Sequence, residues 1–306
     1  MTNQMSYTTE EIAALLKVSK LTVYDLIKKG DLPSYRVGKQ MRVDDADLEA
    51  YKNKTKSGIA AVQEDPSAYM ESKTIVITGQ DISLDILTKH IEKNTKNIRP
   101  LRSYVGSLDS LISMYKGDSD IVSTHLLDGD SGEYNLPYIR KLLTGFHYVV
   151  VNLVIRSAGL FVPKGNPKQI YTWRDLKREG ITIVNREKGS GARVLLDEQL
   201  RLQGMDTRLL KGYDCERSNH IAVAGMVALG EADVGVGIEK AANIVSGVEF
   251  IPMIQERYDL VMIKSPQNME WIAQVMNILK SEAFLHELTS VQGYDLSLTG
   301  TIMYES

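Results

Sequence analysis

Residues 8–51 constrain the fold more than any other part of this chain, because they hold two short helical patterns, a basic hairpin pattern and a third helical pattern in close succession. Thr8 followed by Glu11 is a capping box, in which a hydroxyl and a carboxylate satisfy backbone donors at the start of a helix. Apolar residues then recur at helical spacing and predict one buried face. That face would consist of Ile12, Leu15 and Leu16.

A second helix is predicted over residues 20–29. Ser19 is a suitable N-cap for it, and Gly30 would end it because glycine accepts a left-handed backbone. Its inward face would consist of Val23, Leu26 and Ile27. Two helices joined by so short a turn form a helix-turn-helix, whose second helix enters the major groove of DNA.

The candidate DNA contacts fall on this second helix and on the hairpin that follows it. The hairpin is a strand–turn–strand pattern with Gly38 at its bend, and it predicts a wing that touches the DNA backbone or minor groove. A short closing helix is expected over residues 44–51. The predicted DNA-binding residues are Lys20, Thr22 and Tyr24 on the helix and Arg36, Lys39 and Arg42 on the wing.

The stretch TVYDLIKKGDLPSYRVGKQMRVDDADLEAY resembles the excisionase-like winged helix-turn-helix of the MerR superfamily. The resemblance covers about 45 residues and implies binding to double-stranded DNA. The alternative from the residues alone is a three-helix module for protein contacts. Residues 1–56 hold ten Lys and Arg against eight Asp and Glu, whereas the remainder holds 26 against 31. So weakly basic a head suits DNA binding through two copies on a homodimer.

Composition places the chain among folded soluble proteins, with 43% apolar and 25% charged residues in 306. The longest apolar run, residues 148–155, is far shorter than a membrane span. The N-terminus shows no secretory pattern, and Cys215 is the single cysteine, so we expect an intracellular (cytoplasmic) protein without an internal disulfide. We expect a DNA-binding domain over 1–52, a polar linker over 53–72 and a ligand-sensing domain over 73–306.

From Thr74 onward, short β-branched runs alternate with helical patterns, as in TIVITG followed by DISLDILTKHIEKN. This alternation predicts parallel sheets flanked by helices, and about 230 residues suffice for two α/β lobes with a cleft between them. Small polar residues occupy four strand-to-helix junctions, where free backbone N–H groups can bind an anion. These junctions are 78–81, 106–107, 189–191 and 218–220.

Several stretches of the body resemble the periplasmic-binding-protein-like domain of cytosolic regulators, which is akin to molybdate- and tungstate-binding proteins. The most distinctive are NREKGSGARVLLD and STHLLDGDSGEYN. The resemblance spans about residues 74–280 and implies a type II topology: two lobes, two crossover strands and a ligand in the cleft. It places the crossovers near 125–150 and 245–260, and it makes molybdate or tungstate the expected effector.

Carried over by position, the resemblance predicts a set of ligand-binding residues. It consists of Thr78, Gly79, Gln80, Ser83, Ser107, His125, Arg186, Ser190, Gly191, Arg193, Ser218, Asn219, His220 and Tyr258. Arg193 could pair with the ligand or form a structural salt bridge. His125 could be a structural histidine and His220 a helix cap. Asp81 departs from a Ser-rich oxyanion loop, which leaves an amine-bearing or neutral ligand open.

No motif for catalysis accompanies these residues, so the chain is not expected to be an enzyme, and no cofactor or metal cation is predicted. VGVGIEK lacks the third glycine of a dinucleotide fingerprint, and GMVALGEA lacks the lysine of a phosphate loop. The preferred interpretation is a one-component transcription regulator that senses a small anion. An oxyanion storage protein, a regulator of a small organic ligand and a recombination accessory factor remain alternatives.

Overall fold

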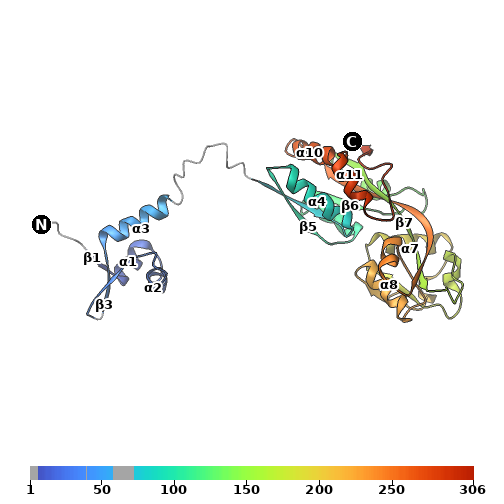
Figure 1. Ribbon diagram of the computed structural model, residues 1–306, viewed down its shortest axis with the longest axis horizontal. Coiled ribbons are helices and arrows are strands. Elements are labelled where there is room, and N and C mark those ends of the chain that lie inside the picture. The colour runs from blue at the N-terminus through green and yellow to red at the C-terminus, as the bar shows by residue number, and fades with distance from the viewer. Residues whose placement is uncertain (1–5, 39, 58–71) are drawn as a thin grey trace. The chain divides into compact units, whose positions relative to one another are not determined.

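The computed structural model describes residues 6–38, 40–57 and 72–306 of the chain. The chain forms two compact units, Met1–Met70 and Glu71–Ser306, which we call the head and the body (Figure 1). Each is a folded unit with its own buried apolar core. No helix in the described ranges is long and apolar enough to cross a bilayer.

The head is a helix-turn-helix with a small antiparallel sheet of strand order β1-β3-β2. Thr8 and Glu11 form the predicted capping box, and the Ser19 side chain accepts a hydrogen bond from the Thr22 amide at the start of the second helix. Gly30 and Gly38 have positive φ angles at the predicted bends. The elements are β1 (Ser6–Thr8), α1 (Thr9–Leu16), α2 (Lys20–Lys28), β2 (Tyr35–Val37), β3 (Gln40–Asp44) and α3 (Asp45–Ser57).

The head differs from the sequence prediction in detail. Leu15 is 52% exposed, because so small a head packs only part of the α1 surface, chiefly Ile12, against its core. The closing helix begins at Asp45 and continues to Ser57, because Asp44 belongs to β3. Part of the predicted linker 53–72 is therefore helical, and its residues 58–71 lie outside the described residues.

The body contains one ten-stranded sheet that runs through both lobes. Eight strands follow the order β5-β4-β6-β11-β7-β10-β8-β9, and β12 and β13 also pair with β7. β4 pairs in parallel with β5 and β6, and β8 pairs in parallel with β9 and β10. Helices follow the strands and cover the sheet, and α10 and α11 pack on α4 (Figure 1). Lobe 1 contains β4 (Lys73–Thr78), α4 (Ile82–Asn94), β5 (Ile98–Ser103), α5 (Ser107–Lys116), β6 (Ile121–Thr124), α6 (Leu136–Leu142), α10 (Met269–Leu279), α11 (Glu282–Thr289), β12 (Tyr294–Asp295) and β13 (Ile302–Glu305).

Lobe 2 is built from the middle of the chain. Its core packs α7, α8 and the strands β8 and β10 around the far half of the long strand β7. Its elements are η1 (Trp173–Lys177), β8 (Ile183–Arg186), α7 (Gly191–Leu202), η2 (Thr207–Leu209), β9 (Glu216–Arg217), α8 (His220–Ala228), β10 (Val234–Ile238) and α9 (Glu239–Ile244).

Two long antiparallel strands join the lobes, β7 (Tyr148–Pro163) and β11 (Val248–Ile263). The first half of β7 packs in the core of lobe 1 and its second half packs in the core of lobe 2. The second crossover begins inside its predicted range. The first begins only at the end of its predicted range 125–150, because a turn and α6 occupy residues 126–147. The body thus has the type II arrangement with a cleft between its lobes.

Candidate functional site

Four helices begin at the cleft, each after a strand of the parallel part of the sheet. They are α4 and α5 from lobe 1 and α7 and α8 from lobe 2, with N-caps Asp81, Gly106, Ser190 and Asn219. The first amides of a helix have no partner within the helix, and they carry the positive end of its dipole. All four starts line either an inner cavity of about 40 Å³ or an adjoining outer pocket of about 700 Å³.

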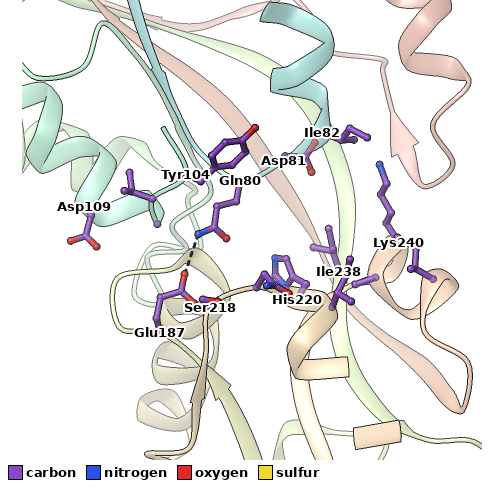
Figure 2. Close-up of a pocket in the computed structure, with 16 residues that line it drawn as sticks. Gln80, Asp81, Ile82, Tyr104, Asp109, Glu187, Ser218, His220, Ile238 and Lys240 are labelled. Carbon is purple, nitrogen blue, oxygen red and sulfur yellow. Dashed lines mark hydrogen bonds between the residues drawn. The ribbon is translucent and has the colours of Figure 1, made fainter. Parts of the chain in front are cut away.

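The two lobes touch across the inner cavity, so the cleft is closed. Arg186 donates to the side-chain oxygen of Gln80 at 2.8 Å. Gln80 in turn donates to Glu187 at 3.3 Å (Figure 2). The backbone N–H of Leu108 donates to the carbonyl of Gly189 at 2.9 Å. Each of these bonds joins lobe 1 to lobe 2.

Gly191 is a point of closest approach between the lobes. A Cβ atom placed on it would lie 2.2 Å from the His125 ring, which is shorter than any van der Waals contact. Glycine at this position therefore lets the start of α7 meet the end of β6. A larger side chain here would hold the lobes apart.

A buried guanidinium organises the wall of the inner cavity. Arg156, on β7, donates through Nε to Glu256 at 2.5 Å and through Nη1 to Asp81. All three side chains are at least 95% buried, so the ion pairs are not screened by water. Burial alone would raise the pKa of Asp81, yet Arg156 and hydrogen bonds from Ser83 hold it below its usual value.

Asp81 therefore offers little free negative charge to a ligand. Its Oδ1 accepts hydrogen bonds from the backbone and hydroxyl of Ser83 and from the hydroxyl of Tyr294, and its Oδ2 accepts from Arg156. Glu256 is the less well stabilised partner, because burial raises its pKa and Arg156 only partly offsets this. Both oxygens of Asp81 are therefore occupied by donors of the protein.

Both histidines of the cavity are neutral near pH 7. Burial lowers the pKa of His125 well below its usual value, and the charges of Arg156 and Arg186 lower it further. The pKa of His220 is lowered by burial first and then by the same two arginines. The Nδ1 of His125 lies 3.0 Å from the hydroxyl of Ser107, which fixes the ring at the start of α5.

Tyr258 lines the cavity, but its hydroxyl proton is already used in a hydrogen bond within the protein. Ser123 Oγ donates to the carbonyl of Thr78 at 3.0 Å and lies 2.7 Å from the Tyr258 hydroxyl. Because a serine has one hydroxyl proton, the Tyr258 hydroxyl donates to Ser123. Burial raises the pKa of Tyr258 to about 12, so it stays protonated.

The outer pocket opens above the inner cavity and is largely apolar. Ile82 and Tyr104 line it from lobe 1, and Ile221, Ile238 and Ile244 line it from lobe 2. Its charged lining residues are Asp81, Asp109, Glu187 and Lys240. Figure 2 shows Lys240 on one side and Asp109 and Glu187 on the other.

The head presents a separate surface. Lys20, Thr22 and Tyr24 are exposed on α2, and Arg36 is exposed on β2. Lys20 forms an ion pair with Glu10 on α1. All four side chains lie outside the buried core of the head.

Comparisons with known proteins agree with this architecture. A family model described as the PBP superfamily domain matches residues 88–280, well over half of the chain. The chain belongs to this family. A second model, described as a helix-turn-helix domain, matches residues 6–56 of the head. The protein thus joins an excisionase-like helix-turn-helix domain to a PBP-like ligand-binding domain.

One relative matches over its whole length: the YvgK protein of Bacillus subtilis (strain 168) is 51% identical over 312 residues, with 100% of both chains covered. A phosphate ABC transporter type substrate-binding protein of Clostridium perfringens, solved with bound phosphate, has a TM-score of 0.52 at 13% identity, covering 73% of this chain and 99% of its own. A mutant of the OxyR protein of Corynebacterium glutamicum, solved with bound hydrogen peroxide, has a TM-score of 0.50 at 12% identity. The match covers 93% of this chain and 89% of the OxyR chain. At such identities these two structures share the fold.

Most of the predicted ligand residues lie together. Nine line the inner cavity, namely Gly79, Gln80, Ser107, His125, Arg186, Ser190, Gly191, His220 and Tyr258. Ser218 and Asn219 line the outer pocket. The remaining three, Thr78, Ser83 and Arg193, line neither.

These three residues have structural partners instead. Arg193 pairs with Asp197 and Glu216 at 3.1 Å, so the salt-bridge alternative is the one the structure contains. The hydroxyl of Ser83 donates to Asp81 at 2.6 Å. Thr78 is buried in β4 with its hydroxyl directed at the carbonyl of Ile121. Each of these side chains is therefore bonded within its own part of the protein and does not line either space.

The other two predicted DNA contacts in the head are Arg42 and Lys39. Arg42 is only partly exposed, and it donates to the hydroxyl of Ser6 at 3.1 Å, which ties β3 to β1. It therefore supports the sheet of the head, in contrast to the exposed Arg36. Lys39 lies outside the described residues.

Sequence reasoning missed Arg156 and Lys240. Arg156 is a lone charge inside the apolar run YVVVNLVIRSAGLFV, and such a charge in a buried strand demands a partner. That signal could have found it. Lys240 follows a strand in VGVGIEK, a stretch considered only as a nucleotide motif. Within the described residues, no cluster of His, Cys, Asp and Glu could hold a metal ion.

Proposed function

We propose that this protein is a one-component transcription regulator, whose head binds double-stranded DNA and whose cleft binds a small anion. The observation that carries the proposal is the convergence of four helix starts on one closed cleft, in a chain with a helix-turn-helix head. Binding of the anion would stabilise the closed body and change the affinity of the head for DNA.

The cavity favours an anion through dipoles. Arg156 and Arg186 are both paired with carboxylates, so neither offers an unshared charge. The first amides of α5 and α7, at Ser107 and Gly191, supply donors that need no counter-charge. A space of about 40 Å³ exceeds the roughly 10–15 Å³ that one water requires, and it suits a compact ion.

Molybdate and tungstate are the first effectors to test. The support is the sequence resemblance of NREKGSGARVLLD and STHLLDGDSGEYN to binding proteins for these ions. The fold relative of Clostridium perfringens was solved with bound phosphate, a tetrahedral oxyanion, which supports testing the same class of ion here.

Regulation requires the anion to prefer one state of the protein. An anion that contacts both lobes favours the closed body. If the DNA affinity of the head differs between the open and closed states, binding of the anion changes that affinity by linkage. About 1.4 kcal/mol of such coupling gives a tenfold response. A homodimer with two heads would convert lobe closure into a change in head spacing, and it would also strengthen binding by a head of low net charge.

The test combines calorimetry with a gel shift. The full chain is titrated with molybdate, tungstate, sulfate and phosphate, and retention of a DNA fragment carrying its own promoter is measured with and without each ion. We expect at least one ion to bind and to change retention. Binding without any change in retention would favour a storage protein, and failure of all four ions to bind would remove the inorganic oxyanions as effectors.

A further inference from the structure

The inner cavity and the outer pocket adjoin each other. They share six lining residues, namely Gln80, Asp81, Val105, Gly106, His220 and Ile238. The outer part, at about 700 Å³, lies within the range of roughly 300–1,000 Å³ that pockets for organic ligands occupy. A compact inorganic ion in the inner cavity would leave nearly all of this volume to water.

The rim of the outer pocket is apolar on both lobes. Ile82 and Tyr104 of lobe 1 are 46% and 62% exposed, and Ile221 and Ile244 of lobe 2 are 49% and 60% exposed. Single exposed apolar residues are ordinary, but four around one opening form a surface that an apolar ligand would cover. One apolar ligand would then contact both lobes, so burial of its surface would favour the closed state.

Lys240 supplies a charge without a partner. Its Nζ is buried and, among the described residues, forms neither a hydrogen bond nor an ion pair. The carboxylate of Asp81 attracts it, but the oxygens of Asp81 are already taken by Arg156, Ser83 and Tyr294. The Nζ of Lys240 lies over the face of the Tyr294 ring, 5.2 Å from the ring centroid.

An unpaired buried ammonium is costly, and burial accordingly lowers the pKa of Lys240. The charge of Asp81 offsets part of this decrease, and the charge of Arg156 adds to it. An acid group of a ligand would remove this cost by pairing with Nζ. Asp109 and Glu187 lie on the far side of the pocket from Lys240 (Figure 2), and their negative charges would repel an acid group there. The lining therefore sets the direction in which an organic acid would lie.

We propose that the effector is an organic anion with an apolar body, whose acid group pairs with Lys240 and whose body lies between Tyr104 and the isoleucines of the rim. This inference rests on the proposed function, because it takes the cleft as the effector site and names the class of ligand. A polar end of the same molecule would reach the helix starts of the inner cavity.

The test uses a matched pair of probes, naphthalene-2-carboxylate and the neutral naphthalene-2-carboxamide, titrated by fluorescence into the full chain. We expect the wild type to prefer the carboxylate by at least about tenfold, the usual strength of a charge-assisted hydrogen bond in a protected site. Lys240→Gln should abolish this preference while leaving the weaker binding of the amide. Lys240→Arg should restore most of it.

Two further variants separate the parts of the pocket. Ile244→Asn should weaken both probes by a similar factor, because it removes apolar surface and no charge. Lys116→Gln, at an exposed lysine of α5, should change neither. Equal affinity of the wild type for the two probes, no binding of either, or an undiminished preference in Lys240→Gln would each overturn the inference. Thermal melting of each variant identifies any that fail to fold, and Lys240→Arg then decides.

The same samples distinguish this inference from the proposed function. If molybdate or tungstate binds and changes DNA retention while the carboxylate does not bind, the regulator stands and the organic-anion inference fails. If the carboxylate binds through Lys240 but DNA retention never changes, the ligand class stands and regulation by this cleft fails.

Discussion

The head and the body differ in how their candidate sites relate to their cores. In the head, Lys20 and Arg36 are exposed on α2 and β2, and the core beneath them is a separate set of apolar residues. In the body, Arg156 lines the cavity and is itself almost fully buried. The head can therefore change its contacts without losing its fold, whereas in the body recognition and stability depend on the same groups.

The largest expected effect tests this dependence directly. Arg156→Met would leave Asp81 and Glu256 as buried carboxylates without their cation, and breaking a buried pair in this way costs about 3–5 kcal/mol. We expect the free energy of unfolding of the body to fall by this amount in urea denaturation, together with ligand affinity.

The matched control is Arg208→Met, since Arg208 pairs with Asp206 on the surface and is 86% exposed. It should change the free energy of unfolding by less than about 0.5 kcal/mol. If Arg156→Met were equally mild, the claim that the body shares one set of groups between site and core would be wrong.

The second prediction concerns closure. Gly191→Val would place side-chain atoms in the His125 ring, and overpacking of this kind costs about 1–3 kcal/mol. The cost falls on the closed state, so we expect ligand affinity to fall by about tenfold to 100-fold in calorimetry. Gly225→Ala on α8, where a Cβ meets nothing within 4 Å, should leave affinity unchanged. Normal affinity of Gly191→Val would mean that binding does not need the closed cleft.

A third prediction follows from the two buried histidines. Their folded pKa values lie below the value of about 6.5 in the unfolded chain, so the unfolded state takes up protons first as the pH falls. Their contribution to stability is therefore present above about pH 6.5 and decreases below it, by roughly 1 kcal/mol between pH 7 and pH 6 for the pair. Urea denaturation over this range measures the slope.

His125→Gln should reduce that slope, whereas His286→Gln at an exposed position should not. The head contains no histidine, so protonation of histidine should not change its free energy of unfolding over this pH range. An identical pH response of both units would show that other groups cause it.

The smallest expected effect belongs to the head. Arg36→Ala should weaken DNA binding severalfold and lower the slope of log affinity against log salt by about 1, without changing the melting temperature. Arg42→Ala should instead lower the melting temperature of the head, because Arg42 bonds to Ser6 across the sheet. Equal effects of the two variants on stability would contradict the division between exposed contacts and core in the head.

Much of the head was predictable from the sequence because its signals are local. The capping box of Thr8 and Glu11, the N-cap Ser19 and the left-handed Gly30 each depend on residues within four positions. The prediction was wrong at Leu15, which was expected on the buried face of its helix but is 52% exposed. Exposure depends on what packs opposite a residue, and no local pattern states that.

In the body, the sequence by itself determined the alternation of strands and helices and the polar residues at the helix starts, since both depend on short-range backbone preferences. Only the tertiary structure decided which charges meet. Asp81 finds Arg156 at a separation of 75 residues and Tyr294 at 213, and this saturation leaves Lys240 without an acceptor. The physical reason is that a buried charge is stabilised by whichever partner the fold brings within hydrogen-bond distance, and the crossing of β7 and β11 between the lobes sets that distance.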